Sequence, residues 1–267
     1  MPSYEIRDKV FFITGGARGL GKEIAKGVLA KGSKVFFVDI LKEKGEETLR
    51  EMAHHFGAKN VAFSQVDVVN KDEFEGAFNE ATQKFGQVDV LLNNAAIVDE
   101  TNTKRTADIN FFAVIQGSQV ASSHMRKDKG GKGGRIIAMS SIAGLNYYYQ
   151  LPVYNATKHG IRVYSKASSQ NPANEAMGLE FACFHPDAAN VGVFPRIDEA
   201  RRGIAEAAQL IESYQGKFVS VASVVEAFID LVSLEKMNGA DLYVGKNKKT
   251  FIDMKKQEVR DKFPIGS

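Results

Sequence analysis

A tyrosine and a lysine, Tyr154 and Lys158, stand four residues apart in this chain. On a helix that spacing places the phenol and the ammonium on one face, one turn apart. A lysine cation beside a phenol favours the phenolate and is expected to lower the pKa of the phenol. The pair could then exchange a proton with a substrate oxygen as a general acid and base. Because the same spacing also occurs by chance on exposed helices, its interpretation depends on the rest of the chain.

A glycine-rich segment, 15–21, lies near the N-terminus between two elements of different periodicity. Residues 9–14 form a short apolar run rich in β-formers, which predicts a buried strand, and apolar residues at helical spacing follow the glycines. Glycine lets the backbone turn tightly and approach a phosphate, and a helix N-terminus offers free N–H groups to an anion. The segment therefore predicts a phosphate-binding turn; the alternative is an ordinary connection between strand and helix.

An acidic residue, Asp39, ends the second predicted strand, about twenty residues after the glycines. This position suits a carboxylate that binds the hydroxyl groups of an adenosine ribose. The same carboxylate would repel a 2′-phosphate, so it favours NAD over NADP. Arg18, inside the glycine segment, favours the opposite choice because a guanidinium pairs with phosphate. Asp39 is given the greater weight, since its carboxylate would occupy the place of the phosphate.

Four motifs resemble, in order and rough spacing, those of the short-chain dehydrogenase/reductase family between residue 6 and about 190. They are Thr14-Gly15-Gly16-Ala17-Arg18-Gly19-Leu20-Gly21, Asn93-Asn94-Ala95-Ala96, Ser140-Ser141, and Tyr154 with Lys158. Segments 133–145 and 158–161 are most similar to the NAD-dependent branch that contains the 15-hydroxyprostaglandin dehydrogenases and the insect alcohol dehydrogenases. The resemblance implies an NAD-dependent oxidoreductase that interconverts an alcohol and a ketone by hydride transfer.

The resemblance also implies a role for each matching residue. Tyr154 would be the general acid and base, Lys158 would lower its pKa and hold the nicotinamide ribose, and Ser141 would bond the substrate oxygen. Asn110 fits the asparagine that supports a water in a proton relay; its alternative interpretation is a polar residue inside a helix. The residues expected to bind the cofactor are Gly15, Arg18, Gly19, Leu20, Gly21, Asp39, Ile40, Asp67, Val68, Asn94, Ala95, Tyr154, Lys158, Pro186 and Val191.

Three departures from the family pattern bear on activity. Asp187 stands where the family usually has the glycine of a Pro-Gly turn, and Val191 replaces a threonine that commonly bonds the nicotinamide carboxamide, a bond valine cannot donate. Proline inside a helix costs about 3 kcal/mol, so Pro172 is expected to kink or end the lysine-bearing helix near Asn171. Two alternatives to an active enzyme stay open: a cofactor-binding protein without catalysis, and a storage or interaction protein on the same scaffold.

Alternating strand and helix signals predict an α/β fold. We expect one Rossmann-type, doubly wound domain over 1–267, with about seven mostly parallel strands, helices on both faces and a substrate lid near 192–219. The predicted strands lie near 9–14, 34–39, 61–66, 88–93, 134–140, 178–185 and 240–245. In such a sheet the ligand crevice lies beyond the carboxyl ends of the strands. The candidate residues expected at those ends are Thr14, Asp39, Asp67, Asn93 and Ser141.

Bulk properties exclude several classes of protein. The formal net charge is +3, and the most basic stretches, 126–132 and 246–249, are predicted to be solvated loops, because nucleic-acid binding needs a broader basic stripe with aromatics. No apolar segment has the length of a membrane span, and a signal-peptide core is missing, so the cytoplasm is the default compartment. The one cysteine, Cys183, excludes an internal disulfide and is expected in the core. The five histidines show no ligand spacing, so no metal is predicted.

The segment 145–151 lies between Ser141 and Tyr154 and is expected to line the substrate pocket. Together with apolar residues of 192–219, it favours a hydrophobic secondary alcohol or ketone, such as a lipid, terpenoid or steroid. The alternative is that these aromatics pack in the core or at an oligomer contact. The family resemblance further implies a homodimer or homotetramer, assembled through the helices that carry Asn110 and Tyr154.

Overall fold

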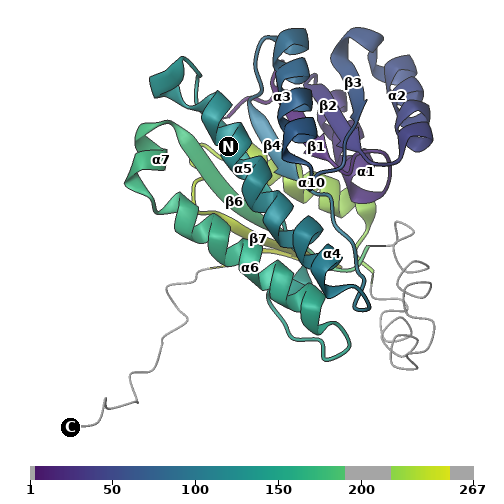
Figure 1. The fold of residues 1–267 in the computed structure, drawn as a ribbon, viewed down its shortest axis with the longest axis vertical. Helices are drawn as coiled ribbons and strands as arrows, with labels where there is room; N and C mark the ends of the chain where they lie inside the picture. The colour runs from purple at the N-terminus through teal and green to yellow at the C-terminus, as the bar shows by residue number, and fades with distance from the viewer. Residues whose placement is uncertain (1–3, 190–217, 253–267) are drawn as a thin grey trace.

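The fold is one sheet covered by helices on both faces (Figure 1). The computed structural model describes residues 4–189 and 218–252. Val191 and residues 192–217 of the predicted lid therefore lie outside the described residues. Within the described residues, eight strands follow the order β3-β2-β1-β4-β5-β6-β7-β8. The predicted doubly wound α/β fold is confirmed, with eight strands in place of about seven.

The seven predicted strands all form, and their ends lie within two residues of the expected positions. The strands are β1 (Val10–Thr14), β2 (Lys34–Asp39), β3 (Val61–Gln65), β4 (Val90–Asn93), β5 (Gly134–Met139), β6 (Leu179–Pro186), β7 (Asp241–Gly245) and β8 (Lys248–Phe251). Strands β1 to β7 pair in parallel. Long apolar runs mark these strands because parallel sheets are buried on both faces.

The helices connect the parallel strands and alternate with them along the chain. In the part of the chain that the structure describes, they are α1 (Gly19–Ala30), α2 (Lys42–Phe56), α3 (Lys71–Phe85), α4 (Thr103–Ala107), α5 (Ala113–Met125), α6 (Pro152–Ser169), α7 (Pro172–Ala176) and α10 (Val221–Val232). The shorter helical turns are η1 (Ala58–Asn60), η2 (Asp108–Phe112), η3 (Lys127–Lys129) and η4 (Ile142–Gly144). Of these, η2 is a π-helical turn.

The sheet separates two apolar cores, because strand side chains point alternately to its two faces. Phe11 packs on one face with Phe228 of α10, and the two ring centroids lie 6.5 Å apart. Its neighbour Phe12 packs on the other face against Phe74 of α3, at 5.4 Å. In Figure 1, α3, α5 and α6 cover the near face, and α1 and α10 lie behind the sheet. Packing on both faces fixes the strand ends that carry the predicted site.

The eighth strand corrects the expectation for segment 246–249, which was predicted to be a solvated loop. The chain turns after β7 and returns as β8, which pairs antiparallel with β7 at the edge of the sheet. All four side chains of β8 are exposed. Because neither face of this edge strand is buried, its sequence carries no apolar run or alternation that would predict a strand.

The break after α6 confirms the prediction made from Pro172. Helix α6 ends at Ser169, and the short helix α7 begins at Pro172 itself. Asn171 caps α7, since its side-chain oxygen accepts a hydrogen bond from Ala173 N at 3.0 Å. Proline is tolerated at a first helical position because its missing N–H would have no partner there.

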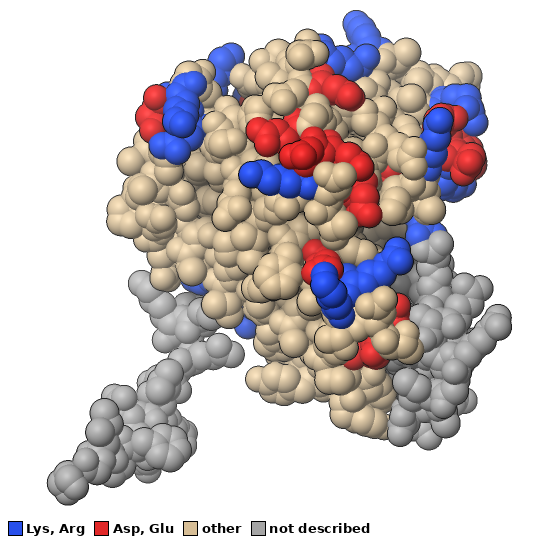
Figure 2. All heavy atoms as spheres, in the orientation of Figure 1, with Lys and Arg blue, Asp and Glu red and all other residues tan. Residues whose placement is uncertain are grey.

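The surface carries mixed charge on the face shown in Figure 2, where Lys and Arg lie beside Asp and Glu and most of the area is neither. Among the described residues, no helix combines the length and the apolar character needed to cross a membrane.

Candidate active site

A large cavity opens at the carboxyl ends of the parallel strands, where β1 separates β2 from β4. Its volume is about 1270 Å³, above the range of roughly 300–1,000 Å³ typical of small-molecule sites. The sheet order places Asp39, at the end of β2, on one side of this crevice and Ser141, just after β5, on the other. Doubly wound sheets bind ligands at such a switch point. The cavity can hold an extended cofactor with a substrate beside it.

The glycine segment forms the turn between β1 and α1. Gly15 and Gly19 have φ angles of +67° and +61°, a left-handed conformation that strongly favours glycine. A Cβ on Gly21 would collide with the backbone oxygen of Gly15, so this glycine permits the close contact between helix and turn. The segment therefore brings bare backbone and the N-terminus of α1 to the cavity wall. These features fit the pyrophosphate of a dinucleotide.

Asp39 lies at the end of β2 with its carboxylate at the cavity wall, 8% exposed. One oxygen accepts a hydrogen bond from Ala17 N, and the other from Leu41 N, both at 3.1 Å. Burial raises the pKa of Asp39, and these backbone hydrogen bonds partly offset that effect. The carboxylate is thereby held in a fixed orientation, with lone pairs left for a ribose hydroxyl. Arg18 lines the same cavity.

The structure brings most of the predicted cofactor residues together around this cavity. Those that line it are Gly15, Arg18, Gly19, Leu20, Asp39, Ile40, Asp67, Val68, Asn94, Ala95, Tyr154, Lys158 and Pro186. Gly21 lies behind the wall, and Val191 is outside the described residues. Asn94 also has a structural task, because its side-chain amide donates to the backbone oxygens of Thr14, at 2.8 Å, and Gly15, at 3.1 Å.

Ser141, Tyr154 and Lys158 meet at the β5 side of the cavity. Tyr154 lies in the first turn of α6 and Lys158 one turn later, and the Ser141 hydroxyl lies near enough to the Tyr154 phenol to lower its pKa. Lys158 is buried, and its Nζ lies 5.5 Å from the centroid of the Tyr154 ring. The phenol, the hydroxyl and the ammonium are thus arranged around one point where a substrate oxygen could bind.

The pKa of Tyr154 contradicts the sequence prediction. Burial raises it to about 12, and the nearby Ser141 hydroxyl lowers it only in part. The lysine ammonium donates a hydrogen bond to the backbone oxygen of Met139 at 2.7 Å, and Lys158 is not among the groups that shift the pKa of Tyr154. Burial lowers the pKa of Lys158 to about 8. At neutral pH the pair is therefore a neutral phenol beside a mostly protonated lysine, so Tyr154 is ready to act first as an acid.

Asn110 lies in the π-helical turn η2 and is fully buried. Its side-chain oxygen accepts from Ile97 N at 2.9 Å, and its amide donates to Ile97 O at 2.8 Å. The side chain therefore fixes the segment that follows β4, behind the cavity wall. Such π-helical turns often occur at functional sites. The role of Asn110 in a proton relay stays a prediction.

Ser140 and Ser141 both border the cavity, but their hydroxyl groups make different hydrogen bonds. The Ser140 hydroxyl donates to the backbone oxygen of Lys158 at 3.0 Å, and its N–H donates to Phe184 O at 2.8 Å. The Ser141 hydroxyl instead accepts from Ala143 N at 3.2 Å and faces the cavity. Ser140 therefore attaches the strand end to α6, which leaves Ser141 available to a ligand.

Glu100 is a residue of the site that the sequence analysis missed. Its two carboxylate oxygens accept hydrogen bonds from Val153 N and Tyr154 N, each at 2.9 Å. A carboxylate at this place binds the free N–H groups of the first turn of α6 and complements the helix dipole. Because Glu100 is more than fifty residues away in sequence, local capping signals could not reveal it.

The segment 145–151 lines the substrate region only in part. Tyr148 and Leu151 contribute to the cavity wall, together with Ile142 and Ala143 of η4. Tyr147 points away from the cavity and is 87% exposed, with its ring stacked on His159 at 5.3 Å. The prediction that the whole segment lines the pocket was therefore wrong, because Asn146, Tyr147 and Tyr149 are exposed to solvent.

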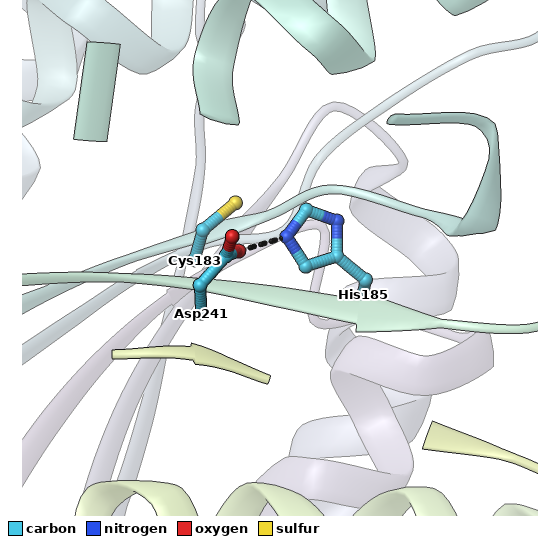
Figure 3. Close-up of side chains that lie close together, drawn as sticks. All are labelled: Cys183, His185 and Asp241. Atoms are coloured by element: carbon cyan, nitrogen blue, oxygen red, sulfur yellow. Dashed lines mark hydrogen bonds and ion pairs between the residues drawn. The ribbon is translucent and has the colours of Figure 1, made fainter. Parts of the chain in front are cut away.

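A second group of titratable side chains lies beside the site. Cys183 and His185 of β6 and Asp241 of β7 offer ligand-type atoms that lie within 4.8 Å of one another (Figure 3). The sequence showed no metal-ligand spacing because parallel pairing of β6 with β7, not sequence proximity, brings these residues together. Both oxygens of Asp241 are already bonded, one to His185 and the other to Arg162. Cys183 is buried, as predicted.

Comparison with known proteins agrees with the motifs. The short chain dehydrogenase family matches residues 9–200 of this chain. Human 15-hydroxyprostaglandin dehydrogenase [NAD(+)] is 35% identical over 196 residues, which cover 73% of each chain. L-2,3-Butanediol dehydrogenase of Corynebacterium glutamicum is 32% identical over 200 residues, or 71% of this chain and 75% of that protein.

The fold agrees with a solved structure as well. A short chain dehydrogenase/reductase from Burkholderia phymatum, crystallised in complex with NAD, superposes with a TM-score of 0.77. The match covers 90% of this chain and 89% of that one at 20% sequence identity, so it supports the fold alone.

Proposed function

This chain belongs to the short-chain dehydrogenase/reductase family, and we propose that it is an NAD(H)-dependent oxidoreductase that interconverts a hydrophobic secondary alcohol and its ketone, with Tyr154 as the acid and base. That it acts on CH–OH groups follows from its family. The proposal for this chain rests mainly on one observation. Tyr154, Ser141 and Lys158 share a cavity with the glycine turn and Asp39, so reacting groups and cofactor-binding groups face the same space.

The residues around the cavity fit a dinucleotide. Bare backbone at Gly15 and Gly19 and the N-terminus of α1 would hold the pyrophosphate, and Asp39 would bind the adenosine ribose. Asp39 supports NAD rather than NADP because a fixed, buried carboxylate repels a 2′-phosphate. The human relative is named for NAD(+), which agrees with this choice. When bound, the nicotinamide supplies or accepts the hydride.

The proton chemistry belongs to Tyr154. In ketone reduction the neutral phenol donates its proton to the carbonyl oxygen as the hydride arrives at the carbonyl carbon. In alcohol oxidation the phenolate takes the hydroxyl proton as the hydride leaves, so atoms and charge balance in both directions. Ser141 would donate a hydrogen bond to the oxygen on which negative charge develops. Since the pKa of Tyr154 is raised to about 12, oxidation should accelerate with rising pH more than reduction.

The apolar character of the substrate is supported by the wall near Tyr154. Val98, Ile142 and Leu151 line the cavity, and their side chains offer no polar atom to a ligand. Leu151 holds a position where the resembling prostaglandin enzymes carry a polar glutamine. The same cavity is also lined by polar side chains such as Asp99, Asn102 and Arg105. The proposed substrate class therefore rests on the three apolar side chains, beside which the hydroxyl groups of a polyol would lose hydrogen bonds to water.

We also propose that the chain is a single domain that assembles as a homodimer or homotetramer through α5 and α6. Phe112, the last residue of η2 just before α5, and Val163, on α6, are 58% and 60% exposed. Large apolar side chains on the two helices implied by the family resemblance support that contact. Light scattering that shows a monomer at assay concentration would contradict it.

The first experiment is a titration of NADH and of NADPH into the purified protein, followed by nicotinamide fluorescence. NADH should bind the more tightly, and apolar secondary alcohols should then be oxidised with NAD. Tyr154→Phe should lower turnover by roughly 10²- to 10⁴-fold, the usual contribution of a general acid or base. Tyr164→Phe is a matched control, because Tyr164 lies on the same helix but does not line the cavity.

The outcomes separate the candidate functions. If the protein bound neither dinucleotide, the result would favour a storage or interaction protein on the same scaffold. Binding without turnover that depends on Tyr154 would indicate a cofactor-binding protein without catalysis. Faster turnover of small polyols than of apolar alcohols would contradict the proposed substrate class while leaving the reaction type intact.

A further inference from the structure

Three buried charged side chains form a chain of hydrogen bonds beneath the site. They come from three elements: Arg162 from α6, His185 from β6 and Asp241 from β7. Arg162 Nε donates to one oxygen of Asp241 at 2.9 Å, and the other oxygen bonds to His185 Nε2 (Figure 3). All three residues are at most 7% exposed. Charged side chains are rarely buried to this degree unless they are paired with an opposite charge or a hydrogen-bond partner.

The other ring nitrogen of His185 reaches the active site. His185 Nδ1 lies 3.2 Å from the backbone oxygen of Ser141. Both partners of the imidazole, the Asp241 carboxylate and the Ser141 carbonyl, are acceptors. Each ring nitrogen must therefore carry a proton to make its bond, which makes the ring an imidazolium cation. The cation lies between the Asp241 carboxylate and the peptide of Ser141, whose side chain lines the cavity together with Tyr154.

Arg162 ties the same network to the helix that carries the reacting side chains. It stands four residues after Lys158, so the two lie on one face of α6. Its ion pair with Asp241 holds that face against β7. At its other end, the network holds the turn after β5 through His185. The helix bearing Tyr154 and the turn bearing Ser141 are thereby attached to the same carboxylate.

We propose that Arg162, Asp241 and His185 are positioning residues, which keep the Ser141 hydroxyl in register with Tyr154 by joining α6 to the Ser141 peptide. This role rests on the proposed function. A network used only for stability has no need to end on the reactive serine, and apolar residues often stabilise an interior equally well. A displacement of about 1 Å between reacting groups can cost about 10²-fold in rate.

A metal ion is a competing use of Cys183, His185 and Asp241, and the geometry disfavours it. Arg162 already places a cation on one oxygen of Asp241, and His185 is bonded to the other. A metal would have to displace the proton shared by His185 and Asp241 and would lie beside the buried guanidinium and imidazole. Stoichiometric zinc in the purified wild-type protein, measured by elemental analysis, would overturn the proposal.

The test compares two substitutions of one residue. His185→Leu removes both ring nitrogens, whereas His185→Asn places an amide N–H where Nδ1 lies and can still donate to the Ser141 oxygen. His185→Leu should lower kcat by about 10²-fold with NADH affinity unchanged. His185→Asn keeps the bond to Ser141 but loses the bond to Asp241, so it should recover only part of that loss. A loss of NADH affinity in place of kcat would refute the positioning role, and full recovery with asparagine would refute the link through Asp241.

Glu180→Gln supplies a control for lost stability. It weakens the ion pair of partly exposed Glu180 with buried Arg135, whose atoms lie 2.9 Å apart at the opposite end of β6 from His185. Where Glu180→Gln loses as much stability as His185→Leu does, its kcat should still stay near the wild-type value. If His185→Leu lowered kcat no more than Glu180→Gln does, the network would serve stability alone.

A crystal structure of His185→Leu gives a readout that does not depend on activity. The proposal expects the Ser141 hydroxyl to move away from Tyr154, and an unmoved hydroxyl would overturn it. Failure of the proposed function would look different, since the wild-type protein itself would then show no turnover that depends on Tyr154.

Discussion

The charge on His185 predicts how the stability of the fold depends on pH. Burial acts to lower the pKa of His185, but the charges and hydrogen bonds of Cys183 and Asp241 act to raise it. The net effect raises the pKa to about 9, from 6.5 for an unperturbed histidine. Because the pKa in the folded state is the higher one, the stabilisation is fully present below pH 6.5 and is lost as pH rises through 9. At 1.36 kcal/mol for each pH unit, the difference corresponds to about 3 kcal/mol.

Lys158 titrates in the opposite sense over part of this range. Burial lowers its pKa to about 8, from 10.5, so above pH 8 the folded protein gives up this proton before the unfolded chain does. This term makes the folded state more stable as pH rises from 8 toward 10.5. The free energy of unfolding of the wild-type protein should therefore fall by about 1–2 kcal/mol from pH 6.5 to 8 and then level off near pH 9.

The measurement is urea unfolding at several pH values, followed by far-UV circular dichroism because the chain contains no tryptophan. His185→Asn cannot take up the proton, so the stability difference between wild type and variant should shrink by about 2–3 kcal/mol from pH 6.5 to 9. Lys158→Met removes the opposing term, and its stability should keep falling to pH 9. A difference between wild type and His185→Asn that stays constant over this range would refute a cationic His185.

Three further predictions concern the cavity. Asp39→Ser removes the charge that repels a 2′-phosphate, so NADPH should bind more tightly by about tenfold or more, equivalent to about 1.4 kcal/mol, in the fluorescence titration. Glu100→Gln keeps the side-chain shape but weakens the charged hydrogen bonds to α6. It should lower the free energy of unfolding in urea by about 1–3 kcal/mol and also lower kcat. Asn171→Ala is its control: it removes the cap of α7 and should lower stability without a change in kcat. Ser141→Ala should lower kcat by roughly 10²- to 10³-fold in steady-state assays, as loss of one donor to a developing oxyanion does, and an unchanged kcat would exclude that role.

The sheet could be predicted from sequence because its central strands are buried on both faces. Residues 10–13 and 35–38 are apolar without interruption, and polar residues end both runs. Residues at the carboxyl ends of those strands converge by topology alone, which is why Asp39 and Ser141 could be assigned to one site. The edge strand β8 lacked that signal because its four side chains face solvent.

Other parts of the site depend on contacts between distant residues. Glu100 caps α6 from the segment after β4, and His185 meets Asp241 across a strand pair separated by 56 residues in sequence. The pKa of Tyr154 was predicted with the wrong sign because a four-residue spacing gives proximity to Lys158 but says nothing about burial. In the fold, desolvation of the phenol outweighs the effect of a lysine that bonds elsewhere.

The departures at 187 and 172, which first raised the alternative of an inactive scaffold, have ordinary structural explanations. Asp187 replaces a glycine, yet among the described residues the one non-glycine residue with positive φ is Asp8, so the turn at 187 needs no glycine conformation. The Asp187 carboxylate accepts from the Tyr243 hydroxyl at 2.9 Å and from Ala188 N at 2.7 Å. Pro172 lies beyond the end of α6 and starts a new helix. Because neither residue disturbs the turn that carries Ser141 or the helix turns that carry Tyr154 and Lys158, both departures are compatible with an active oxidoreductase.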